Sequence, residues 1–387
     1  MLRMFLQSVG ILGAAFLALI AVSILSDIQR VEEIAYVRPV APSLPLATST
    51  EEAAPAAEET GVVEPVQEIA AQPVNEAQPA AAAQSQEADT GNQVQRIQDP
   101  YPFNRKSESE LYASAWSATV NIFCETRGPL SSISGSGVVI DPRGVILTNA
   151  HVAQYMLLAS QPDIALQCFI RTGSPAQKRY KADILHIPSE WVTEHAEDIA
   201  ARRPKGTGEH DYALLLITEA TDGSRLPSSF PHLLSDTREA IAFASDKVLL
   251  AGYPAEFAIQ DAGVTTLYPT SIFTRIGDLL TFGERSVDLI SLGGAVLAQS
   301  GSSGGAVINE WGRLVGIIST TSEGTTTAER ELRAITLAYI NRDISRATGM
   351  DLASFLSGDM SIKATHFMQN EAPSLANQII EQLPKSQ

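Results

Sequence analysis

The chain has 387 residues and a formal net charge of −17, with 44 Asp and Glu against 27 Lys and Arg. An acidic surplus of this size argues that nucleic acid is no partner, because phosphate backbones are bound by clustered Lys and Arg. Residues 27–100 alone hold 13 acidic residues and three arginines, which is −10 of the −17. The surplus is therefore mainly a property of one segment and not of a charged functional surface.

An apolar run from Met4 to Leu25 is long enough to cross a bilayer as a helix. Arg3 precedes the run and acidic residues follow it, so the positive-inside rule puts the N-terminus in the cytoplasm and the rest of the chain outside. Residues 4–25 are therefore predicted to be a transmembrane signal-anchor helix of a single-pass membrane protein. Two alternatives stay open, a signal peptide cleaved near the small residues 21–23 and a buried helix of a globular core.

Residues 26–105 are predicted to be a disordered linker. Ala, Pro, Glu and Gln dominate its composition from residue 39 to residue 100, with hardly an aromatic side chain among them. Such a segment cannot bury enough apolar area to offset its chain entropy, and its like charges repel one another. We expect a solvated spacer between the membrane and a globular part that starts at about residue 106.

Residues 106–347 are predicted to form an all-β domain. Short β-type runs separated by turns fill this part of the chain, and regular spacing of this kind is typical of sandwiches and barrels. Six runs precede residue 220 and seven follow residue 246: 118–123, 137–140, 144–147, 164–170, 181–185, 212–217, 247–254, 263–267, 271–276, 287–291, 306–308, 314–319 and 335–340. A two-barrel arrangement fits the count. A closing helix begins near Asn341, and the tail at 348–387 is expected to be partly helical.

Three motifs follow one another in the order His, Asp, Ser: T-N-A-H-V at 148–152, D-Y-A-L-L at 211–215 and G-S-S-G-G at 301–305. A serine hydroxyl is a poor nucleophile at neutral pH unless a base takes its proton, and a carboxylate must fix the tautomer of that base. Each motif alone is weak, but their combination predicts Ser303 as nucleophile, His151 as general base and Asp211 as its partner.

The glycines around Ser303 allow a tight loop that aims successive backbone N–H groups at one point. In acyl transfer that point is the position of the oxyanion. The N–H groups of Gly301 and Ser303 are the predicted oxyanion hole. The chain has no residues at metal-ligand spacing and no phosphate-binding glycine loop, so neither a metal nor another cofactor is expected. The remaining histidines, His210 among them, are interpreted as surface or structural residues.

These motifs, together with residues 135–140 and 306–309, resemble the trypsin-like serine peptidases of the chymotrypsin fold, and most closely the bacterial HtrA/Deg branch. The resemblance covers about residues 112–347. It implies two six-stranded antiparallel β-barrels with the triad in the cleft between them. Two departures stand out: the 47 residues after Ile340 are too few for the PDZ domain that this branch usually carries, and Ser302 stands where the vertebrate trypsin branch has Asp. Neither PDZ-based peptide sensing nor activation by a new N-terminus is therefore inferred.

The resemblance also implies a disulfide and a substrate pocket. Cys124 directly follows the run counted as first, and Cys168 lies on the run counted as fourth. These runs are neighbours in the family's barrel, so an exported domain could bridge the two cysteines; the bridged and the free forms both stay open. The pocket for the residue before the cut would be formed by uncharged residues, which favours small or medium aliphatic side chains. Its predicted lining is Leu297, Ala298, Ile318, Ser319 and Thr320.

The expected function is that of a membrane-anchored serine endopeptidase that hydrolyses exported or misfolded proteins in the periplasm or at the cell surface. The rival is a catalytically silent peptidase-fold module that binds polypeptides as a chaperone or scaffold. The polar stretch at 190–208 is either a loop that shapes the cleft or an insertion. The sequence carries no signal for the oligomeric state.

Overall fold

The structure is a computed structural model that describes residues 96–97, 99–126, 131–200, 207–255, 259–261, 264–283, 286–321 and 331–383. The predicted transmembrane segment at 4–25 and the linker up to residue 95 lie outside the described residues. None of the helices that are described is long and apolar enough to cross a membrane. Residues 99–105 belong to the folded part, because the Tyr101 hydroxyl donates to Asp236 at 2.5 Å and accepts from Asn309 at 2.9 Å. The folded part thus extends beyond the predicted boundary at residue 106.

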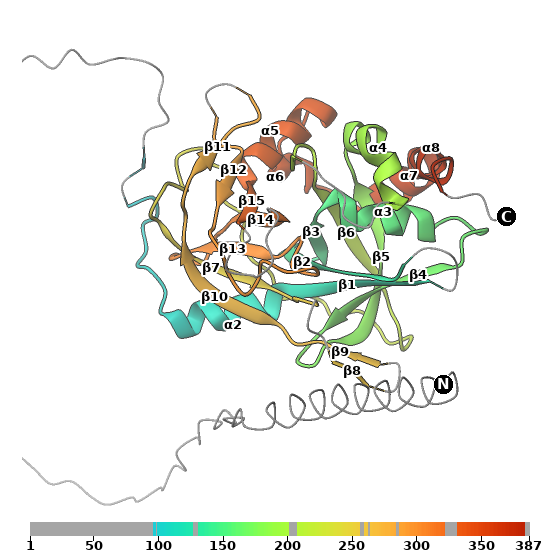
Figure 1. Ribbon diagram of the computed structural model, residues 1–387, viewed down its shortest axis with the longest axis horizontal. Helices are drawn as coiled ribbons and strands as arrows, with labels where there is room; N and C mark the ends of the chain where they lie inside the picture. Colours follow the sequence, from blue (N-terminus) through green and yellow to red (C-terminus); the bar gives the residue numbers. More distant parts are fainter. Residues whose placement is uncertain are drawn as a thin grey trace, which may run out of the picture. The chain divides into compact units, whose positions relative to one another are not determined.

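The first β unit is a closed antiparallel barrel, as the strand count before residue 220 predicts (Figure 1). Its strands follow the order β1-β2-β3-β6-β5-β4, and apolar side chains such as Ile122, Ile146 and Leu215 fill its interior. The turn between β2 and β3 needs Gly144, whose φ is +90°. The bounds are β1 Thr119–Thr126, β2 Ile133–Asp141, β3 Val145–Thr148, β4 Leu166–Thr172, β5 Gln177–His186 and β6 Ala213–Ala220.

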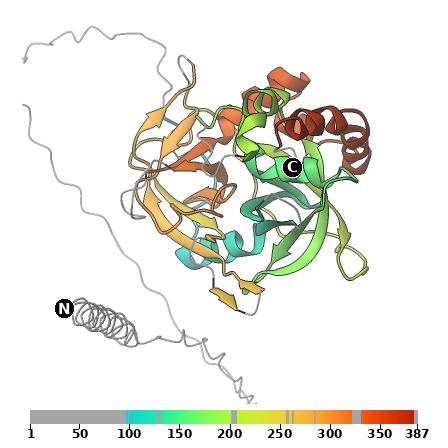
Figure 2. The same cartoon turned by 45° about the vertical axis from the view of Figure 1, so that its right-hand side comes forward.

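The second β unit lies beside the first and differs from the predicted six-stranded barrel (Figure 2). It is a seven-stranded sheet in the order β10-β7-β13-β14-β15-β12-β11, with a separate hairpin of β8 and β9. The end strands β10 and β11 do not pair with each other among the described residues. Gly277, which lies between them in the chain, donates its N–H to Ser291 O of β12 at 2.8 Å. The bounds are β7 Lys247–Gly252, β8 Ile259–Asp261, β9 Val264–Thr266, β10 Thr270–Arg275, β11 Leu279–Leu280, β12 Leu289–Ser291, β13 Ala306–Asn309, β14 Leu314–Thr321 and β15 Leu332–Thr336.

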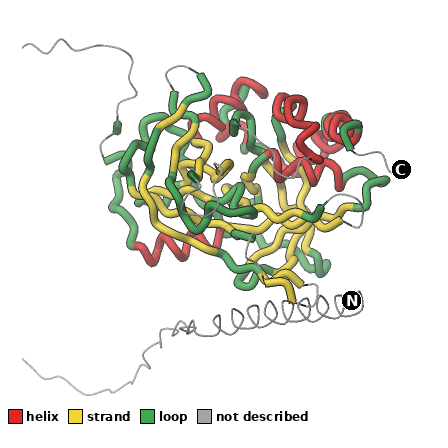
Figure 3. Tube along the Cα trace, in the orientation of Figure 1, coloured by secondary structure: helices red, strands yellow, loops and turns green. Residues whose placement is uncertain are grey.

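Helices α4 to α8 gather along the upper side of the two β units, and α2 lies at the lower side (Figures 1 and 3). The closing helix starts four residues before the predicted Asn341, because Thr336 caps it by accepting from Tyr339 N. The bounds are α2 Glu108–Ala118, α3 Ala150–Ala159, α4 Ser189–His195, a 3₁₀ helix Ala196–Ala200, α5 Leu337–Thr348, α6 Leu352–Phe355, α7 Met360–Asn370 and α8 Ala372–Ile380. The stretch predicted as a loop or insertion therefore holds α4 and the 3₁₀ helix.

The C-terminal helices are part of the first barrel's packing. Helix α7 packs on β5, and α8 packs on α3 and α4. Phe367, Leu375 and Ile379 are buried in the same apolar cluster as the barrel interior. Residues 348–383 therefore cover the barrel and are more than a partly helical tail.

A disulfide joins Cys124 and Cys168. The two residues face each other in the register of β1 and β4, with their Cα atoms 4.0 Å apart. The structure thus has the bridged form of the two forms that the sequence left open.

Candidate active site

His151 stands in the first turn of α3, directly after β3. Asn149 lies between β3 and α3, and its side-chain amide donates to Asp211 O at 2.8 Å. The His151 N–H belongs to the first helical turn and so has no partner inside the helix. It donates instead to Asp211 Oδ1 at 2.9 Å. The start of α3 is thereby joined to the chain just before β6.

The Asp211 carboxylate fixes the ring of His151. The distance from His151 Nδ1 to Asp211 Oδ2 is 2.8 Å. A carboxylate only accepts hydrogen bonds, so Nδ1 carries the proton and Nε2 is left as a base. Burial lowers the pKa of His151, but the charge and the hydrogen bond of Asp211 outweigh burial, and the pKa of the imidazole is raised above 6.5.

Asp211 is 4% exposed and remains a carboxylate because its partners all stabilise the charge. Burial by itself raises the pKa of Asp211, whereas the charge of His151 and hydrogen bonds from His151 and Ser319 lower it, and the net shift is downward. The Ser319 hydroxyl donates to Asp211 Oδ2 at 2.8 Å. Ser319, predicted as a pocket wall, is therefore a partner of the acid.

Ser303 lies in the loop between β12 and β13. Gly304 in this loop has a φ of +84°, and a Cβ there would lie 2.1 Å from Ser136 O, so only glycine fits. The Ser303 hydroxyl donates to Ser319 O at 3.3 Å. Among the described residues no hydrogen bond joins Ser303 Oγ to His151, so the predicted triad is connected through Ser319, which binds Asp211 by its hydroxyl and Ser303 by its carbonyl.

The N–H groups of Gly301 and Ser303 meet no acceptor within the described part of the chain. The carbonyls of the same two peptide groups are engaged, because Ser300 O accepts from Ala255 N at 2.8 Å and Ser302 O from Gly305 N at 2.9 Å. The C=O and N–H of a trans peptide point in opposite directions. Both N–H groups thus point away from these partners, and neither has an acceptor among the described residues.

Three of the other residues predicted for the substrate pocket are in the protein core. Leu297, Ala298 and Ile318 are at most 1% exposed and belong to the apolar cluster of the second sheet. Their side chains fill the sheet interior, and their role in a substrate pocket stays a prediction. The side chain of Thr320 lies outside the described residues.

Helix α5 holds the segment that precedes Asp211. His210 has a φ of +57°, its N–H donates to the Tyr339 hydroxyl at 3.0 Å, and its Nδ1 lies 2.9 Å from Asp343 Oδ2. The hydrogen bond of Asp343 raises the pKa of His210. Asp343 also pairs with Arg346 at 3.1 Å. Sequence reasoning grouped His210 with surface or structural histidines, and this contact gives it a structural role next to the acid.

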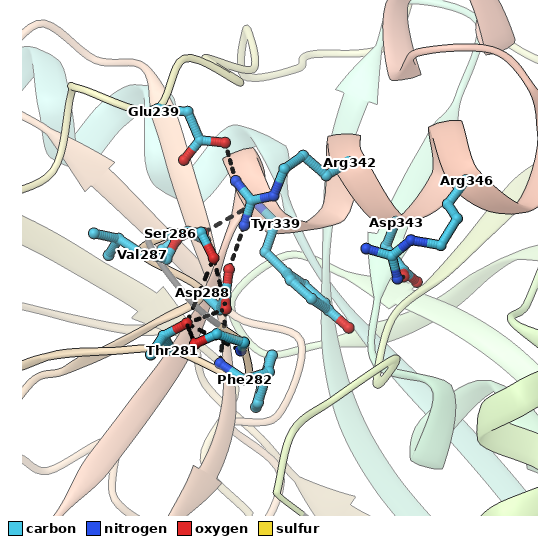
Figure 4. Close-up of polar contacts among 12 residues, drawn as sticks. Glu239, Thr281, Phe282, Ser286, Val287, Asp288, Tyr339, Arg342, Asp343 and Arg346 are labelled. Carbon is cyan, nitrogen blue, oxygen red and sulfur yellow. Dashed lines mark hydrogen bonds and ion pairs between the residues drawn. The ribbon is translucent and has the colours of Figure 1, made fainter. Parts of the chain in front are cut away.

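The same helix also holds the loop between β11 and β12 (Figure 4). Arg342 pairs with Glu239 and with the buried Asp288. Asp288 in turn accepts from Thr281 Oγ1 at 2.9 Å and from Phe282 N at 2.7 Å. Through these contacts one helix supports both the Asp211 segment and a loop of the second sheet.

Comparisons with known proteins agree with this geometry. Residues 135–317 match the family described as a trypsin-like peptidase domain. No curated protein matches the chain. The matched residues include His151, Asp211 and Ser303, and a closed six-stranded barrel beside a second sheet is consistent with the chymotrypsin fold. The match supports a trypsin-like serine peptidase. Within the described residues no group of three or more His, Cys, Asp or Glu side chains is arranged to hold a metal.

Proposed function

From the trypsin-like peptidase domain at residues 135–317 we propose that this protein is a serine endopeptidase in which Ser303, His151 and Asp211 form the catalytic triad. The observation that carries the proposal is the buried Asp211 carboxylate, which fixes the His151 ring at 2.8 Å, leaves Nε2 as a base and is linked through Ser319 to Ser303.

The reaction follows from the groups at this site. Rotation of the Ser303 side chain from Ser319 O toward His151 Nε2 lets the imidazole take the hydroxyl proton as Oγ attacks the scissile carbonyl. The developing oxyanion is held by the N–H groups of Gly301 and Ser303. His151 then gives the proton to the leaving amine as the C–N bond breaks. In the second half, His151 takes a proton from the water that attacks the acyl-enzyme and returns it to Ser303 Oγ as the ester bond breaks, which releases the carboxylic acid product. No step uses a cofactor.

The compartment and the substrates belong to the same proposal. A disulfide between Cys124 and Cys168 supports an oxidising location outside the cytoplasm. Together with the apolar run at 4–25 it supports an extracytoplasmic domain of the HtrA/Deg type that is anchored to the membrane and acts on exported or misfolded proteins.

One observation favours the silent-module alternative. The Ser303 hydroxyl donates to Ser319 O and, among the described residues, not to the imidazole, so it is not activated by the base in this arrangement. Catalytic hydrogen bonds are often long or absent before substrate binds, so this geometry does not outweigh the oriented base.

Reaction with a fluorophosphonate separates the two functions. We expect covalent labelling of the purified protein that is abolished in Ser303→Ala. Ser302→Ala is the matched control, because the Ser302 hydroxyl is buried without a hydrogen-bond partner among the described residues and its loss should leave labelling intact. A folded protein that does not label, or that labels equally well after Ser303→Ala, would contradict the proposal.

A further inference from the structure

Ser136, on β2 of the first barrel, reaches across to the nucleophile loop of the second sheet. It is fully buried. Its backbone N–H donates to Ser303 O at 2.7 Å, and its hydroxyl donates to Gly301 O at 2.7 Å. Ser136, which is outside the triad, thus binds the carbonyl oxygens of Gly301 and Ser303, the two residues whose N–H groups form the proposed oxyanion hole.

The hydroxyl of Ser136 also has a second partner. It accepts from the backbone N–H of Tyr253, just after β7, at 2.8 Å. A serine hydroxyl can donate one bond and accept others at the same time, so it satisfies a buried donor and a buried acceptor together. Alanine at this position would leave both Tyr253 N and Gly301 O buried and unpaired.

Ser136 and Ala255 together constrain the two peptide groups on either side of Gly301. Gly301 has a φ of +93°, a conformation that glycine adopts without strain, so the orientation of its two peptide groups must come from their partners. The peptide before Gly301 is held by Ala255 N through Ser300 O, and the peptide after it by Ser136 Oγ. Ser136 Oγ also accepts from Tyr253 N, two residues before Ala255. The Ser136 hydroxyl therefore fixes the position of Gly301 O relative to the segment that binds Ser300 O.

The same residue is tied to the base. Ser136 O accepts from Thr148 Oγ1 at 2.7 Å, and Thr148 ends the strand that leads to His151. Ser136 is therefore hydrogen-bonded both to the loop that carries Gly301 and Ser303 and to the last residue of the strand before α3.

We propose that Ser136 is a positioning residue that sets the orientation of the oxyanion-hole amides through the carbonyl of Gly301. The inference rests on the proposed peptidase function and adds a residue to it. Since the oxyanion forms only during reaction, loss of the Ser136 hydroxyl should slow the chemical step and leave ground-state binding nearly unchanged.

The test compares fluorophosphonate inactivation of Ser136→Ala and the unmodified protein, with the rate constant kinact separated from the binding constant KI. We expect kinact and the rate of casein hydrolysis to fall by about 10–100-fold, less than the 10²–10³-fold typical of a deleted oxyanion donor, while KI stays within about twofold. Ser134→Ala is the matched control, because Ser134 lies two residues away on β2 and its hydroxyl accepts from Asn121 Nδ2. That variant should keep full kinact.

Ser136→Cys covers the case in which the alanine variant does not fold. A thiol is a weak donor of similar size, so an intermediate loss of kinact is expected. If folded Ser136→Ala retains the kinact of the unmodified protein, or if only its KI changes, the positioning role is refuted while the peptidase function stands. An unmodified protein that neither labels nor cleaves casein would refute both.

Discussion

The disulfide between Cys124 and Cys168 allows a quantitative prediction. It closes a loop with a sequence separation of 44 residues. The chain-entropy relation then gives about 4 kcal/mol of stabilisation at 25 °C, acting through the unfolded state. The bond joins residues already paired across β1 and β4, so its removal should leave the native barrel in place. The perturbation is the double variant Cys124→Ala with Cys168→Ala, since Cys124 is fully buried and a polar replacement would add a second cost.

Urea unfolding followed by circular dichroism measures the effect. For a domain of this size, with m of about 3 kcal/mol/M, a loss of about 4 kcal/mol lowers the midpoint by about 1.3 M. The unmodified protein in reductant should approach the midpoint of the double variant, which serves as the control for the substitutions themselves. Two titratable thiols in the unfolded, non-reduced protein, or identical midpoints with and without reductant, would refute the reasoning.

Four further predictions concern the proposed site. Peptidase activity should fall by about 10⁴-fold or more in each of the variants Ser303→Ala, His151→Ala and Asp211→Asn, because triad members act as a unit. Casein hydrolysis measures the activity, and circular dichroism checks that each variant is folded. Wild-type turnover in any one of the three would exclude that residue from the triad. The peptidase activity should rise with pH with a midpoint above 6.5, because His151 must be neutral to act as a base and Asp211 raises its pKa. In Asp211→Asn the midpoint of the residual activity should move to lower pH. An unmoved midpoint would show that another group titrates. Conversely, the lowered pKa of Asp211 contributes stability that is complete above about pH 3.8 and is lost as the pH falls below it, as acid unfolding of the same variant would report. Ser319→Ala removes one of the hydrogen bonds that lower the pKa of Asp211, so acid unfolding should move to higher pH and activity should drop by about 10-fold; equal acid midpoints would mean that the bond contributes nothing.

The first barrel could be predicted from sequence because its signals are local. Alternating apolar residues and the turn at Gly144 define adjacent antiparallel strands without reference to distant parts of the chain. Local signals gave a wrong prediction at residues 335–340, which were predicted as one strand. An apolar run does not distinguish strand from buried helix, and the Thr336 cap divides this one between β15 and α5. Helix α2 was missed although Ser107 and Glu110 form a capping box at its start.

The parts of the site that could not be predicted depend on contacts between distant segments. The order of the His, Asp and Ser motifs indicates the triad candidates, but no pattern in the chain shows that the Ser319 hydroxyl turns toward Asp211, 108 residues away. Likewise, whether Leu297 and Ile318 face a cleft or the core depends on how the second sheet curls. The hydrogen bond from the Ser136 hydroxyl to Gly301 O joins residues 165 positions apart, and it can be identified only from the folded structure of both β units.

The segment that matches the trypsin-like peptidase family is shorter than the segment that folds. The family match begins at residue 135, inside β2, and ends at residue 317, inside β14. It leaves out β1, which closes the barrel, and α8, which covers the helix that carries His151. A recombinant fragment of residues 135–317 would lose Cys124 of the disulfide. It would also lose α5, whose Tyr339 binds the residue before Asp211. Expression should therefore retain residues 96–383, and homology borders are a poor guide to where this protein can be divided.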